Sequence, residues 1–136
     1  MAKPITNRTE VLLRQIHPSS YKDGRPASDR FRPLPSDAGF MSVDRSSLTT
    51  AAASHALYVS TGSKSAAVFG ISVEEFNAEA LRCVEDPLSA SDGQPANAAH
   101  ALVDYTDFHE KKWKTISKRL WNKAVTRGQL YPVDKP

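Results

Sequence analysis

The sequence contains a single cysteine, Cys83, among its 136 residues. One cysteine cannot form an internal disulfide, so the chain does not belong to the small secreted domains that disulfides hold together. This shortage favours a reducing compartment, and we therefore expect a cytoplasmic protein. The neighbouring Arg82 would lower the thiol pKa and make a nucleophile conceivable. We favour the commoner role of a lone cysteine beside apolar residues, which is a small buried side chain.

Long hydrophobic runs are also missing. The longest stretch without a charged residue, 46–63, contains a histidine and many serines and threonines. A membrane-spanning helix needs about 20 mostly apolar residues, so we expect no membrane contact. The first four residues, Met-Ala-Lys-Pro, lack the apolar core of a secretory signal.

Glycine and histidine are too scattered to form a recognised cofactor or metal motif. None of the six glycines belongs to a G-x-x-x-x-G-K or G-x-G-x-x-G pattern, which binds nucleotide phosphates. No two of the four histidines stand three or four residues apart, as zinc ligands on one helix do. We therefore expect neither a metal ion nor a bound cofactor.

What remains is an ordinary globular composition, with 40% hydrophobic and 24% charged residues. A chain of this length fits one domain and buries roughly two-thirds of its unfolded surface, which suffices for a hydrophobic core. We expect residues 1–136 to form a single globular domain.

Apolar patterns and turn residues predict strands at 10–16, 40–43, 67–71, 82–84 and 100–105. For the first of these, a helical turn from Thr6 or Asn7 is an alternative, because short apolar runs fit both structures. Helices are predicted at 48–60, 72–81 and 107–127.

Local signals mark the ends of these helices. Thr49 or Thr50 is the expected cap of the first helix, and Ser72 with Glu75 matches the capping box of the second. The segment 17–39 is rich in proline, serine and aspartate and predicts a long ordered loop, which is often functional. Together these elements predict an α+β fold, a small mixed sheet with three packed helices.

The C-terminal helix has the clearest pattern. Its apolar stripe consists of Trp113, Ile116, Leu120 and Ala124. Thr106 or Asp107 is the expected cap and Gly128 the expected left-handed end. Leu130 and Tyr131 are expected to fold back onto the core.

The same helix concentrates positive charge. Seven basic residues lie between positions 107 and 128 against two acidic ones, and this excess of five exceeds the net charge of +3 for the whole chain. Basic side chains interleaved with tryptophans are typical of surfaces that bind a phosphate backbone. The candidate nucleic-acid-binding residues are Lys111, Lys114, Lys118, Arg119 and Lys123. The alternative is a solvated helix face.

A second candidate site begins with Arg14 and His17, at the end of a predicted strand and the start of the long loop. The planar guanidinium of an arginine binds phosphate or carboxylate, and a histidine serves as a general base or as a hydrogen-bond donor to a ribose. Alternatively, Arg14 pairs with a carboxylate and His17 caps the loop.

Ser42 and His100 complete this candidate site. Ser42 lies on a predicted strand without the G-x-S-x-G pattern of a nucleophile elbow. His100 begins a strand with Asp104 on the same face, which suits a catalytic pair or a structural one. If the protein is an enzyme, we expect Arg14, His17, Ser42 and His100 to be the catalytic residues.

Short motifs link the chain to a family. R-Q-I-H-P at 14–18, G-R-P at 24–26, F-R-P at 31–33, Asp37 and M-S-V at 41–43 resemble an uncharacterised family of small bacterial and phage proteins. His100-Ala101 and the segment 124–131 match further motifs of the same family. The resemblance covers most of the chain and implies a bacterial or phage origin, without implying an activity.

The strand residues are also similar to ADP-ribosyltransferase-like toxin domains, which open with an Arg or His on the first strand and a Ser on the second. That resemblance implies a catalytic glutamate on a later strand, a role that only Glu74, Glu75 or Glu85 would fill here.

Three functions follow as hypotheses. The first is a protein-binding module, such as an accessory or immunity-type protein of a bacterial gene pair, that uses segment 17–39 or the basic helix. The second is a nucleotide- or nucleic-acid-directed enzyme with the four-residue site above. The third is a sequence-tolerant nucleic-acid binder.

Overall fold

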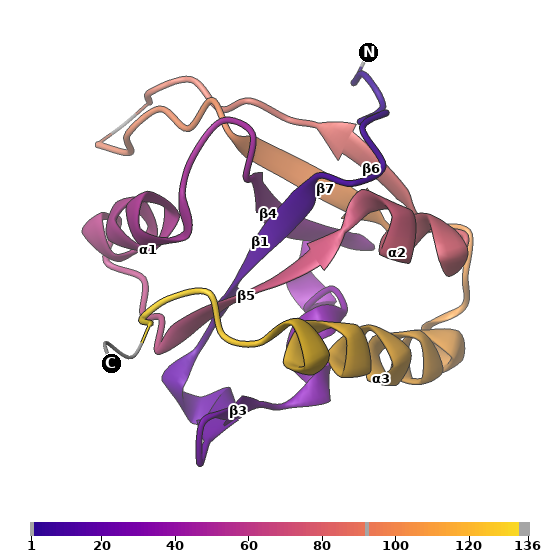
Figure 1. Ribbon diagram of the computed structural model, residues 1–136. Coiled ribbons are helices and arrows are strands. Elements are labelled where there is room, and N and C mark those ends of the chain that lie inside the picture. The colour runs from indigo at the N-terminus through magenta and orange to yellow at the C-terminus, as the bar shows by residue number, and fades with distance from the viewer. Residues whose placement is uncertain (1, 92, 134–136) are drawn as a thin grey trace.

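The computed structural model describes residues 2–91 and 93–133. Its centre is a five-stranded sheet in the order β5-β1-β4-β7-β6 (Figure 1). The strands are β1 (Val11–Ile16), β4 (Phe40–Arg45), β5 (Ala67–Ser72), β6 (Arg82–Glu85) and β7 (His100–Asp104). All neighbouring strands pair antiparallel. The predicted α+β class is confirmed, although the sheet is antiparallel throughout rather than mixed in direction.

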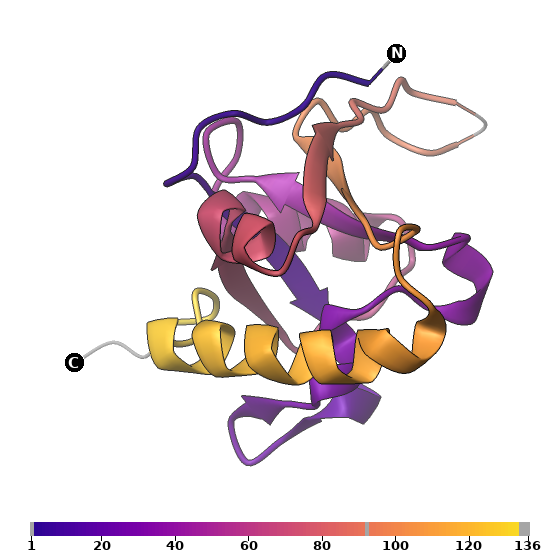
Figure 2. The same ribbon diagram turned by 90° about the vertical axis from the view of Figure 1, so that its right-hand side faces the viewer.

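Three helices cover the sheet: α1 (Ala51–Ser60), α2 (Val73–Ala78) and α3 (Glu110–Arg127). Helices α2 and α3 lie on one face, and α1 lies on the other (Figures 1 and 2). The main core is formed between the sheet and α2 and α3, where Phe76, Ile116 and Leu120 meet Leu12 and Val103. No helix in the described ranges is long and apolar enough to cross a membrane.

Segment 17–39 is ordered by short elements. It contains the 3-10 turns η1 (Pro18–Ser20), η2 (Ser28–Phe31) and η3 (Pro35–Asp37) and the small hairpin β2 (Tyr21–Lys22) and β3 (Arg25–Pro26). The indole N–H of Trp121 donates to the Pro26 carbonyl at 2.7 Å, which fastens the hairpin to α3. Phe31 is fully buried in the core, which fastens η2 to the sheet.

The predicted caps of two helices are confirmed, although α1 begins at Ala51 rather than at residue 48. Thr50 caps α1, since its side chain accepts the Ala53 N–H at 3.1 Å. Ser72 and Glu75 form the capping box of α2, with each side chain accepting the other residue's backbone N–H.

Other predicted boundaries are wrong. Helix α2 ends at Ala78 rather than 81, because Ala80 turns to a φ of 59° and directs Leu81 into the core. Helix α3 begins at Glu110 rather than 107, and His109 is its cap. The expected cap Asp107 is not used. The chain ahead of the helix turns instead around Asp104, whose side chain accepts the Thr106 N–H at 2.8 Å.

The end of α3 is close to its prediction. Gly128 has a φ of 96°, but its ψ of 163° lies outside the left-handed helical region. This extended exit carries the chain to the edge of β5, where Leu130 N–H donates to the Val68 carbonyl and Tyr131 forms a bridge with Val68.

One irregularity of the sheet positions the candidate site. Strands β1 and β4 pair only at Leu12↔Arg45 and Leu13↔Asp44. By contrast, β1 pairs with β5 along its whole length. Beyond Leu13, strands β1 and β4 separate, and the turn η2 lies next to the gap between them.

Candidate functional site

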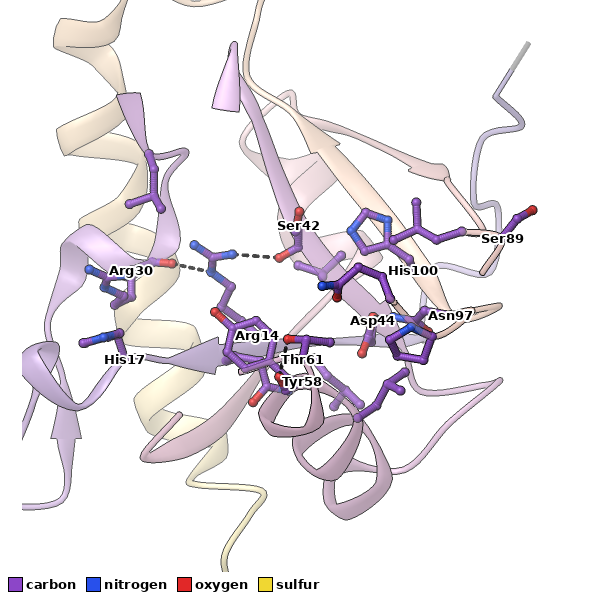
Figure 3. Close-up of a pocket in the computed structure, with 18 of the residues that line it drawn as sticks. Arg14, His17, Arg30, Ser42, Asp44, Tyr58, Thr61, Ser89, Asn97 and His100 are labelled. Atoms are coloured by element: carbon purple, nitrogen blue, oxygen red, sulfur yellow. Dashed lines mark hydrogen bonds between the residues drawn. The ribbon is translucent and has the colours of Figure 1, made fainter. Parts of the chain in front are cut away.

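A cleft of about 440 Å³ opens at the gap between β1 and β4. Its walls come from both strands, from η2, from α1 and from the loop that precedes β7 (Figure 3). The four residues that the sequence analysis grouped as one site, Arg14, His17, Ser42 and His100, all line this cleft.

Arg14 lies toward one end of the cleft and bridges the separated strands. Its Nε donates to the Arg30 carbonyl at 2.7 Å, and its Nη1 donates to the Ser42 carbonyl at 2.8 Å (Figure 3). Neither acceptor is a carboxylate, and within residues 2–91 and 93–133 no acidic side chain forms an ion pair with Arg14. The alternative prediction of an Arg14–carboxylate pair is therefore wrong for the described residues.

Arg30 of η2 brings a second guanidinium to the same end of the cleft. Its Nε donates to the Ser20 hydroxyl at 3.0 Å, and the Asp29 carboxylate stands 3.9 Å away, at the outer limit of an ion pair. Burial lowers the pKa of Arg14 from its ordinary value, and the charge of Arg30 lowers it further. Both arginines line the cleft, and the charge of Asp37, which raises the pKa of Arg14, stands beyond ion-pair distance from it.

His17 stands next to these arginines and caps η1. The Ser19 N–H donates to its Nδ1 at 3.1 Å, and its carbonyl accepts the Ser20 N–H at 2.9 Å. Since Nδ1 accepts a backbone hydrogen, the N–H of the ring is on Nε2 in this arrangement. The predicted capping role is thus present, and the ring also lines the cleft.

Asp44 and His100 lie at the opposite end of the cleft, facing each other across β4 and β7. The Asp44 carboxylate accepts hydrogen bonds from Ser54 Oγ at 2.6 Å and Asn97 Nδ2 at 2.9 Å. His100 Nδ1 lies 3.0 Å from both the backbone carbonyl and the carboxylate of Asp86.

The predicted His100–Asp104 pair does not form. Asp104 instead accepts a hydrogen bond from Arg82 at 2.9 Å and from the Thr106 hydroxyl at 2.5 Å. These contacts satisfy the Asp104 carboxylate. Asp104 and His100 stand at opposite ends of β7, and for this reason their side chains do not meet.

The candidate nucleophiles are not activated. Ser42 is exposed, and its hydroxyl has no hydrogen-bond partner among the described residues, whereas a nucleophilic serine needs an adjacent base. Cys83 is buried, and burial raises the pKa of its thiol to about 12. Its predicted role as a small buried side chain is confirmed.

Apolar side chains form the rim of the cleft. Leu34, Tyr58 and Leu88 are 38%, 38% and 44% exposed, and all three line the cavity. Sequence reasoning missed these residues, as well as Arg30 and Asn97, because they come from turns, loops and a helix without a functional motif. Only the folded chain brings them together.

The basic face of α3 is a separate candidate. The lysines at its surface are exposed and form no ion pair with any residue that the structure describes: Lys111, Lys112, Lys114, Lys118 and Lys123. Arg119 differs, since it pairs with Glu79 at 2.7 Å, and Arg127 pairs with Glu75 at 2.8 Å. Of the predicted nucleic-acid-binding residues, Arg119 is thus already engaged.

The described residues contain no group of three or more His, Cys, Asp or Glu side chains that could hold a metal ion. Comparison with known proteins adds no relative: no protein-family model matches the chain, and neither a curated protein nor a solved structure is detectably similar to it.

Proposed function

We propose that this protein binds a small phosphate-bearing molecule in the cleft, with the phosphate held by Arg14, Arg30 and His17. The observation that carries the proposal is the pair of guanidinium groups at one cavity, where Arg14 is bound by backbone carbonyls alone and Arg30 is only weakly paired. Positive charges without carboxylate partners are expected where an anionic ligand supplies the missing charge.

The chemistry of these side chains fits phosphate. Guanidinium groups present planar sets of N–H donors that match phosphate oxygens, and such charge-assisted hydrogen bonds are stronger than neutral ones. His17 adds an Nε2–H donor at the same end. Arg14 is held in place before any ligand arrives by its bonds to Arg30 and Ser42, and this pre-organisation lowers the entropic cost of binding.

The size of the cleft favours a small molecule. Ligand pockets are typically about 300–1,000 Å³, and this cleft of about 440 Å³ falls in that range. The proposal differs from the protein-binding module expected from the sequence, because the ligand is a small molecule. It keeps a role for segment 17–39, which supplies His17, Arg30 and Leu34 to the cavity.

Binding is favoured over catalysis because the cleft lacks a coupled nucleophile and base among the described residues. The three glutamates considered for an ADP-ribosyltransferase-like reaction also lie elsewhere. Glu75 pairs with Arg127 and Glu85 with Arg45, while Glu74 is exposed next to Arg8. None of the three lines the cleft.

Calorimetric titration with inorganic phosphate tests the proposal, with acetate as a second anion. Arg30→Gln should weaken phosphate binding about 10- to 100-fold, the equivalent of one charged hydrogen bond. Arg8→Gln is the matched control, because Arg8 is 73% exposed and lies outside the cleft. Absence of phosphate binding to the wild-type protein, or equal losses in both variants, would refute the proposal.

The exposed lysines of α3 support a second candidate function, which is sequence-tolerant binding of nucleic acid. The observation in its favour is the contrast within one helix: the arginines Arg119 and Arg127 have carboxylate partners, whereas the lysines leave their charge to solvent. The phosphates of a nucleic acid bind such lysines, and the counterions that this binding releases favour the complex.

A further inference from the structure

The two histidines of the cleft carry their protons on different nitrogen atoms. Nδ1 of His17 accepts the Ser19 N–H, so the ring proton is on Nε2. Nδ1 of His100 lies 3.0 Å from both the carbonyl and the carboxylate of Asp86, which only accept, so Nδ1 of His100 carries a proton. Nε2 of His100 is therefore the ring nitrogen that remains for a ligand.

The two ends of the cleft differ in chemistry. The first end contains Arg14, Arg30 and His17, whose guanidinium groups and Nε2–H are donors. The second end contains the carboxylate of Asp44, which is an acceptor, next to His100 (Figure 3).

Asp44 retains capacity for a ligand. A carboxylate offers about four lone-pair positions, and the described residues fill two of them, through Ser54 and Asn97. Those two neighbours also fix the orientation of the carboxylate. Asp44 and His100 are cross-strand partners, so their side chains lie on the same face of the sheet, where each can meet one of two neighbouring hydroxyl groups.

We infer that the ligand is a phosphorylated ribose, with its phosphate at Arg14, Arg30 and His17 and its hydroxyl groups at Asp44 and His100. This inference rests on the proposed function and specifies its ligand. A phosphate has acceptors only, and ribose hydroxyls supply the donors that the second end requires. Two sources share this chemistry, a sugar phosphate and a nucleoside phosphate, and the base of the latter would contact Tyr58 and Leu88 at the apolar rim.

Calorimetric titration of the full chain with inorganic phosphate, ribose 5-phosphate and adenosine monophosphate tests the inference. Wild-type protein should bind ribose 5-phosphate at least about tenfold more tightly than phosphate, because the hydroxyls add charged hydrogen bonds. Asp44→Asn should lose about tenfold in affinity for ribose 5-phosphate while its affinity for phosphate stays unchanged. Asp107→Asn is the matched control, since Asp107 is 65% exposed and outside the cleft.

The outcomes separate the two proposals. If phosphate binds and ribose 5-phosphate binds no more tightly, the ribose inference is overturned and the phosphate site stands. If neither binds, both are overturned. If Asp44→Asn weakens phosphate and ribose 5-phosphate equally, the assignment of the hydroxyls to Asp44 is overturned. Tighter binding of adenosine monophosphate than of ribose 5-phosphate supports the inference with a nucleotide as the ligand, and equal affinities support it with a sugar phosphate.

Discussion

Arg14 combines a structural role with the proposed ligand-binding role in one side chain. Its guanidinium replaces the missing strand pairing between β1 and β4 by binding the carbonyls of Arg30 and Ser42. Because both acceptors are neutral carbonyls, they do not neutralise the positive charge of Arg14, which can still attract an anionic ligand. The spacing of Arg14 and His17 in the sequence indicates that these two side chains belong to one site. It does not indicate the carbonyls that Arg14 binds, because these belong to residues 16 and 28 positions away.

The structural role predicts a loss of stability in Arg14→Met. This variant retains a long apolar stem but leaves two carbonyls without their donors, which should cost about 2 kcal/mol of unfolding free energy. Arg14→Lys keeps a charged donor and should lose less. Urea unfolding measures both, and a loss below about 0.5 kcal/mol in Arg14→Met, the range of neutral surface changes, would show that the bridge is unimportant.

Glu10 is the second residue whose contacts predict a strong individual effect on stability. Its side chain is 2% exposed and pairs with Arg45 at 2.9 Å, and it also accepts from the Ser47 hydroxyl at 2.7 Å. Burial by itself raises the pKa of Glu10, but the hydrogen bonds from Arg45 and Ser47 outweigh burial and lower the pKa below its ordinary value of 4.5.

A lowered folded-state pKa fixes the sign of the pH dependence. The stabilisation is complete above the ordinary pKa of 4.5 and disappears as the pH falls through the lower folded-state pKa. Glu10→Gln should cost about 3 kcal/mol at neutral pH, as for a broken buried pair, and should flatten the loss of stability below pH 4.5. An unchanged acid dependence of the unfolding free energy in this variant would contradict the assignment.

At the scale of elements, α3 has two faces with separate roles. Ile116, Leu120 and Ala124 are buried against the sheet, as the apolar stripe predicts. Leu120→Ala should therefore cost about 2–5 kcal/mol by urea unfolding, as large-to-small core changes do. Lys118→Ala, on the exposed face of the same helix, is the control and should change stability by less than about 0.5 kcal/mol. Equal effects would contradict the two-face description.

The exposed face gives a prediction for nucleic-acid binding. Replacing Lys111, Lys114 and Lys118 by Gln should weaken binding to all sequences alike and reduce the salt slope by about 0.7–0.9 for each phosphate that is no longer neutralised. Fluorescence anisotropy with single- and double-stranded oligonucleotides at several salt concentrations measures this. If the wild-type protein does not bind at low salt, the lysines are only a solvated surface.

Helix ends show where sequence reasoning succeeds and fails at this scale. The caps at Thr50 and Ser72 are local hydrogen bonds between residues three apart, so the sequence contains all the information needed. The start of α3 depends instead on contacts between side chains and backbone five to eight residues apart, beyond the reach of a capping pattern. Trp113 Nε1 donates to the Phe108 carbonyl at 3.1 Å, and the ring packs edge-on to buried Tyr105, which holds 105–109 as a turn.

At the scale of the whole molecule, the fold class was predictable because strand and helix patterns alternate clearly along the chain. The cleft was only partly predictable. Arg14, His17, Ser42 and His100 have suggestive residue types and lie near strand ends. Their common cavity, however, depends on where β1 separates from β4, and the non-local pairing of β1 between β4 and β5 sets that point.

The central claim is that the cleft, rather than α3, is the ligand site, and an NMR titration tests it most directly. Nitrogen-15-labelled protein of residues 1–136 is titrated with ribose 5-phosphate while its backbone and arginine side-chain signals are followed. We predict shifts at the backbone amides of Ser42, Tyr58 and Asn97 and at the Nε–H of Arg14 and Arg30, with α3 unchanged. Shifts confined to the α3 lysine positions, or no shifts at saturating ligand, would contradict the account.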